Sequence, residues 1–220
     1  MQPKIVEDLW PVYERAIASG DIETAYHIAC DAARFYEERE DFKQLGMWLQ
    51  NGARCSYDQG KYKEAALMAE NAARIQPDPY YQVRALVLAA GTHFLSLKYN
   101  ESFHLLSEAE EICCNYPSDT FLSAFVRGCR GFLLSKIDVD QAIIDSEESA
   151  RLFLKNNSSG NAAMHINNAG HLLLLAGRPK ESEQRLLAGL ELLNKMQNRI
   201  LEACVFDSLG CVYTMTGRYT

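Results

Sequence analysis

Residues that break helices or form linkers are scarce in this sequence. The 220 residues include 6 prolines and 13 glycines, and no Gly/Ser-rich or Pro-rich run is long enough to act as a flexible linker. No apolar run approaches the roughly 18 residues that a membrane helix requires. The first residues lack the apolar segment of a secretory signal peptide. These absences predict one folded region without a membrane span.

Basic charge is also in short supply. The chain has 22 Lys and Arg against 29 Asp and Glu, which gives a net charge of −7. Because phosphate contacts require clustered Lys and Arg, we expect no nucleic-acid binding by this region. The 7 cysteines are odd in number and lack the spacing of a disulfide framework. They are typical of reduced thiols, and we expect a cytoplasmic protein.

Catalytic and metal motifs are missing. The sequence has no glycine-rich phosphate loop, no His-Glu-x-x-His and no Gly-x-Ser-x-Gly element. His171, Cys204 and Cys211 are the best metal candidates. The two cysteines lie two helical turns apart, roughly 10 Å, which is too far for ligands of one zinc ion. We therefore expect no enzyme, no metal and no cofactor.

A helix-turn-helix pattern is present, and it is clearest from Gly60 to Pro77. A glycine after one helix supplies the left-handed backbone that lets the chain reverse. Ala65, Ala69 and Ala72 then allow a second helix to approach the first closely, and the proline ends that helix. This stretch predicts a hairpin of two antiparallel helices.

The pattern recurs along the whole chain. Its turn positions are Gly20, Gly60, Leu97, Ile137, Gly177 and Gly217, separated by 40, 37, 40, 40 and 40 residues. Two small residues follow each of the first five turns at fixed distances: Ala25 and Ala32, Ala65 and Ala72, Ser102 and Ala109, Ala142 and Ser149, and Ser182 and Gly189. Such regularity predicts a single all-α array over residues 1–220.

The array is predicted to contain five helical hairpins and one further helix. The hairpins are expected over 6–39, 42–75, 80–114, 119–155 and 160–195, and the last helix over 198–216. The fourth hairpin is the least regular, because Arg130 stands where a small residue is expected. Gly131 would fit there if the register were shifted by one residue.

These residues resemble the tetratricopeptide repeat family. Gly60-x-Tyr62-x-x-Ala65 is similar to the turn and second helix of such a repeat, and Leu209-Gly210 with Tyr213 is similar to its first helix. The long spacing resembles the roughly 40-residue repeats of bacterial regulators and adaptor proteins. The resemblance implies a right-handed superhelix. Since the sequence stops early in a sixth repeat, we expect a piece of a longer protein.

The resemblance also implies a concave groove lined by the first helix of each hairpin. Its expected partner-binding residues are Trp10, Gln50, Asn51, Arg54, Tyr57, Arg84, Phe94, Arg127, Asn167, Asn168, His171 and Asp207. No lysine is among them.

Two features of this groove suggest how a partner is held. Arg54, Arg84 and Arg127 come from successive hairpins and could converge on a carboxylate, or each could pair with a neighbouring acid. Asn168, with Asn167 beside it, could bind the backbone of an extended peptide, or could brace an adjacent hairpin. The chaperone-tail clamp of some family members is not matched.

The leading hypothesis is a scaffold that binds a peptide or helix of a protein partner, possibly an acidic one, in this groove. The alternative is an effector-sensing domain of a multidomain regulator. The last helix should lack its packing partner, which would leave Leu209, Val212 and Tyr213 partly bare. We therefore expect self-association through this end.

Overall fold

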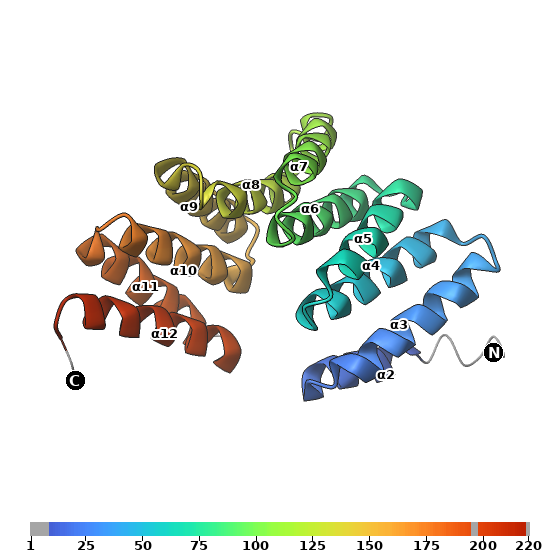
Figure 1. Ribbon diagram of the computed structural model, residues 1–220, viewed down its shortest axis with the longest axis horizontal. Coiled ribbons are helices and arrows are strands. Elements are labelled where there is room, and N and C mark those ends of the chain that lie inside the picture. The colour runs from blue at the N-terminus through green and yellow to red at the C-terminus, as the bar shows by residue number, and fades with distance from the viewer. Residues whose placement is uncertain (1–8, 195–197, 219–220) are drawn as a thin grey trace. The chain divides into compact units, whose positions relative to one another are not determined.

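The computed structural model describes residues 9–194 and 198–218, and the described chain is all-helical (Figure 1). It contains eleven helices and no strand over these ranges, which confirms the predicted fold class. The internal contacts divide the chain into two compact units, Met1–Asn115 and Tyr116–Thr220. The two units are described one at a time, and the single array over 1–220 stays a prediction.

In the first unit, consecutive helices pack against each other in antiparallel hairpins. Its helices are α2 (Leu9–Ser19), α3 (Ile22–Glu37), α4 (Phe42–Asp58), α5 (Tyr62–Ile75), α6 (Pro79–Leu95) and α7 (Tyr99–Cys114). The helix expected from residue 6 is described from Leu9 onward, and residues 6–8 lie outside the described residues.

The second unit repeats this arrangement. Its helices are α8 (Thr120–Leu134), α9 (Val139–Lys155), α10 (Ser159–Leu175), α11 (Pro179–Leu193) and α12 (Arg199–Met215). The last helix packs against both α11 and α10. Thus α12 also contacts the first helix of the preceding hairpin.

The small residues after each turn are the contact points between helices. All ten are buried, with Ala25, Ala65, Ser102, Ala142 and Ser182 completely so. The three serines also bond to the paired helix. Ser102 Oγ donates to the Ala90 carbonyl at 2.7 Å, Ser149 Oγ to the Ala124 carbonyl at 2.7 Å and Ser182 Oγ to the Gly170 carbonyl at 2.6 Å. The sequence pattern therefore marks where the helices cross.

Four of the predicted turns close on a glycine. Gly20, Gly60, Gly177 and Gly217 have φ of 79°, 73°, 73° and 71°, the left-handed region that favours glycine. The next N–H bonds to a carbonyl five residues back, as from Lys61 to Ser56 at 2.8 Å. Leu97 takes the same conformation, with φ of 62°.

The fourth turn is built differently. Ile137 is not among the described residues with positive φ, since a β-branched side chain is strained in that region. Asp138 N–H instead bonds to the Leu134 carbonyl at 2.8 Å, four residues back. A Cβ on Gly131 would lie 2.9 Å from Ser146 Oγ, so Gly131 is the close-packed residue of this hairpin. The structure therefore has the shifted register.

The part of the chain that the structure describes contains no helix both long and apolar enough to cross a lipid bilayer.

Candidate functional site

A hollow of about 670 Å³ lies in the second unit, over the first helices of its hairpins. The side chains that line it come mainly from α8, α10 and α12: Gly131, Phe132, Ser135, Lys136, Asn167, Asn168, His171, Leu172, Leu175, Ala203, Cys204, Asp207 and Ser208, with Ser146 from α9. Four of the predicted groove residues, Asn167, Asn168, His171 and Asp207, are therefore brought to one place.

The helical period explains why these side chains share a face. His171 follows Asn167 by four residues and Asn168 by three, so the three side chains lie on one side of α10, while Ala169 and Leu173 are buried on the other. Asp207 follows Asn167 by one 40-residue repeat and occupies the equivalent place on α12. The repeat thus aligns polar groups from successive helices.

The hollow is mixed in character. Lys136 and Asp207 contribute opposite charges, and the exposed side chains of Phe132 and Leu175 contribute apolar surface. Asn167 Oδ1 is buried, and no described residue donates a hydrogen bond to it.

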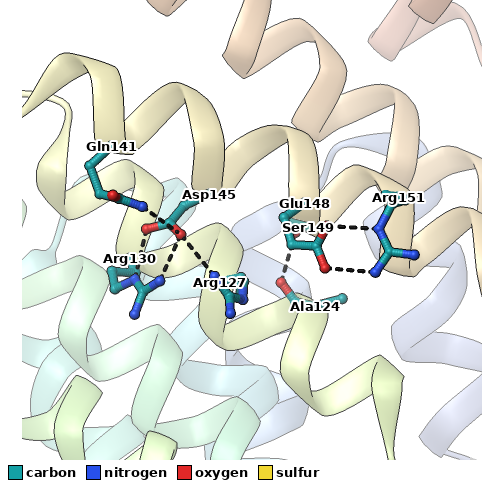
Figure 2. Close-up of polar contacts among 8 residues, drawn as sticks. All are labelled: Ala124, Arg127, Arg130, Gln141, Asp145, Glu148, Ser149 and Arg151. Carbon is teal, nitrogen blue, oxygen red and sulfur yellow. Dashed lines mark hydrogen bonds and ion pairs between the residues drawn. The ribbon is translucent and has the colours of Figure 1, made fainter.

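Arg127 does not stand free in this unit, because it belongs to a buried ion cluster (Figure 2). Asp145 of α9 is completely buried. Arg130 donates two hydrogen bonds of 2.7 Å to its carboxylate, and Arg127 Nη1 donates to Asp145 Oδ1 at 3.2 Å. Gln141 Nε2 donates to the same oxygen at 3.3 Å. The charge of Arg127 is thus shared with a core carboxylate, which favours the pairing interpretation.

The aromatic residues predicted for the groove of the first unit pack against its helices. Trp10 stacks on Tyr13 and meets Trp48 edge to face, with ring centroids 5.6 and 5.4 Å apart. Tyr57 is half-buried against Tyr62, and burial raises the pKa of its hydroxyl. Phe94 is buried in the core, so its expected place in the groove is corrected.

The polar residues predicted for this unit remain accessible. Arg54 is exposed and pairs with Asp58, from Nε to Oδ1 at 3.2 Å. Arg84 is half-buried, with its guanidinium 5.6 Å from the centroid of the Tyr80 ring. Gln50 and Asn51 are half-buried. Because Arg127 belongs to the other unit, the convergence of the three arginines stays a prediction.

Several lining residues were not predicted, notably Lys136, Phe132 and Leu175. Lys136 follows the end of α8, next to the predicted turn position Ile137. Its place could have been found from the shifted register of this hairpin. Over the described ranges, no group of three or more His, Cys, Asp or Glu side chains is arranged to hold a metal ion.

Two solved structures share this fold. BtubC (BKLC) from P. vanneervenii superposes with a TM-score of 0.68 and 16% identity, covering 94% of this chain and 85% of that one. The apo form of RapI gives a TM-score of 0.69 and 14% identity, covering 91% and 74%. Neither a protein-family model nor a curated protein matches the sequence. The chain is therefore a helical-repeat protein of the solenoid class.

Proposed function

We propose that this chain is a tetratricopeptide-like scaffold that binds a segment of a partner protein in the hollow of the second unit. The observation that carries the proposal is the alignment of Asn168, His171 and Asp207 over one hollow by successive repeats. Packed helices lie roughly 8–10 Å apart, so three of them span about 16–20 Å. An extended peptide covers that distance with about six residues.

The lining supports a peptide ligand. The amides of Asn167 and Asn168 offer both donors and acceptors, which suit the N–H and C=O groups of a peptide backbone. Phe132 and Leu175 would contact apolar side chains of the segment. Backbone contacts give affinity, and the apolar side chains add selectivity.

We still propose an acidic partner, but with Lys136 instead of Arg127 as the cation that it meets in the second unit. Asp145 already compensates Arg127, whereas Lys136 lies at the hollow itself. A carboxylate on the partner would meet Lys136, and exposed Arg54 could attract acidic segments to the first unit. Because these charges are accessible to solvent, binding should weaken with added salt.

We further propose that the chain acts in the cytoplasm without catalysing a reaction. All seven cysteines are free thiols, as in a reducing compartment. The net charge of −7 argues against nucleic acid as a partner. The self-association expected from the sequence would use the face of α12 described below, where it competes with the occupant that we favour.

A peptide selection tests the proposed groove. Peptides chosen from a random display library against the wild-type chain would be titrated against Asn168→Ala, with Gln184→Ala as the matched control. Gln184 is an exposed amide on the outer helix α11. Loss of an amide that binds the backbone should weaken binding about tenfold for peptides of unrelated sequence. Equal binding by both variants would contradict the proposal.

A further inference from the structure

At Phe206 and Gly210 the last helix exposes two positions whose counterparts on α10, Ile166 and Gly170, are covered by α11. Phe206 and Met215 are 56% and 62% exposed. With Asp207, Gly210, Cys211 and Thr214 they line a second hollow of about 630 Å³. Leu209 and Val212, which the sequence predicted to be bare, are buried, and Tyr213 is half-buried. They pack in the cluster that α12 forms with α10 and α11, so the open face lies elsewhere on the helix.

The hairpin of α10 and α11 shows what covers such a face. A Cβ on Gly170 would lie 2.7 Å from the Leu186 side chain, so this leucine fills the space above the glycine. A Cβ on Gly189 would lie 3.2 Å from Ile166, so the isoleucine projects toward the second glycine. The two helices therefore interlock at two points, each formed by a large aliphatic side chain against a glycine.

The last helix has a glycine and a large side chain at the two positions that α10 contributes to these contacts. Gly210 and Phe206 follow Gly170 and Ile166 by one 40-residue repeat. Within the described part of the chain, nothing lies within 4 Å of a Cβ placed on Gly210. In the first unit, Gly52, one position earlier in the repeat than Gly170, is likewise covered by a large side chain of the paired helix, that of Met68. The repeat therefore specifies both the vacant position and the residue type that fills it.

We propose that the open face of α12 docks one amphipathic helix of the α11 type, antiparallel to α12, as a continuation of the α10–α11 interface. This helix places a large aliphatic residue over Gly210 and a glycine or other small residue against Phe206. Asp207 borders the face, so a lysine or arginine on the flank of the docked helix strengthens the contact. The surface adjoins the peptide-binding hollow over Asn168, with Asp207 bordering both, but Phe206 and Gly210 do not line that hollow.

A second copy of the chain is the competing occupant. Two antiparallel α12 helices could also set Phe206 of each against Gly210 of the other. A two-fold axis between them, however, brings both Asp207 carboxylates to the same side, where like charges repel. Charge complementarity therefore favours a helix with a basic flank.

A graft supplies such a helix. The residues after Arg218 are replaced by a copy of residues 179–194. Gly217-Arg218 is then followed by the same sequence that follows Gly177-Arg178 in the natural chain. We expect Tm to rise by roughly 5 °C. Gly210→Leu should cancel this gain in the graft yet leave the parent chain folded, since nothing contacts that position. Gly91→Leu is the control, because its Cβ also meets nothing within 4 Å.

A synthetic peptide of residues 178–194 tests docking in trans. It should bind the parent chain in a 1:1 complex, and Gly210→Leu should weaken binding about tenfold or more. A graft with unchanged Tm, or a gain that survives Gly210→Leu, overturns the proposal. The proposal is also overturned if the parent chain forms a dimer that Gly210→Leu dissociates but that the peptide leaves intact. Asn168→Ala should alter none of these results, which separates this surface from the proposed groove.

Discussion

His165 lies in the core of the second unit with its ring stacked on Phe153, the centroids 5.3 Å apart. The Gly128 backbone leaves room for this ring, because a Cβ there would collide with it. Burial lowers the pKa of His165 to about 4, and Nδ1 has no hydrogen-bond partner. The folded chain therefore holds this histidine neutral, whereas an unfolded histidine titrates near pH 6.5.

The buried histidine predicts a pH dependence of stability. Between about pH 6.5 and pH 4 the unfolded chain binds a proton that the folded chain does not, so stability falls as the pH is lowered. The loss between pH 7 and pH 5 should be roughly 2 kcal/mol, measured by urea unfolding. His165→Phe should remove most of this slope, whatever its absolute stability. His104→Phe, at an exposed histidine, should keep it.

In the hairpin of α8 and α9, the two arginines of α8 make unequal contacts with the buried carboxylate of Asp145. Arg130 Nε and Nη2 each lie 2.7 Å from a different Asp145 oxygen, whereas Arg127 makes one contact of 3.2 Å. The side chain of Arg127 is also the more exposed, at 43% against 32%. Removing Arg130 should therefore leave the buried carboxylate poorly compensated.

Stability measurements on two variants test this inequality. Arg130→Ala should lower the free energy of unfolding by about 2–4 kcal/mol, and Arg127→Ala by roughly 1 kcal/mol or less. Chemical unfolding at neutral pH gives both values. If Arg127→Ala were the more damaging, the bidentate pair would not be the main support of Asp145. If Arg127→Ala instead weakened partner binding at unchanged stability, the groove interpretation of this arginine would regain support.

The helices and their crossings could be predicted because they depend on local chemistry. Small residues at fixed places and glycines at turns leave few other arrangements, and all ten predicted small positions are buried. The fourth turn was harder, since Ile137 occupies a glycine position by spacing but cannot easily take its conformation. The anomaly at Arg130 was the available signal, and Gly131 resolves it.

The side-chain partners in the candidate site could not be predicted equally well. Spacing along a helix brought Asn168 and His171 to the hollow, because both lie on one face of α10. The pairing of Arg127 with Asp145 depends on which face of α9 that acid occupies, and the irregular fourth hairpin hid this. Phe94 was misplaced because its helix is apolar on most sides, so periodicity did not identify the exposed face.

For the whole molecule, the division into two units predicts that a fragment of residues 116–220 folds alone. It retains α8 to α12, whose consecutive helices pack on one another, and it contains the candidate hollow. Far-ultraviolet circular dichroism should show a helical spectrum and a cooperative thermal transition. A fragment of residues 139–220 is the control, since it lacks α8, which packs on α9. A non-cooperative 116–220 fragment would indicate that the repeats fold as one array.

The unusual turn at Ile137 also sets rules for exchanging hairpins as cassettes. Gly60 and Gly177 close their turns in the same conformation, so the second helices of α4–α5 and α10–α11 start in equivalent phase. A splice between these two hairpins at the glycine preserves every inward-facing position. At Ile137 the register between the turn and the preceding helix differs by one residue. A shift of one residue rotates a helix by about 100°. A splice there would turn the inner face of the transplanted helix toward solvent unless the missing residue were restored.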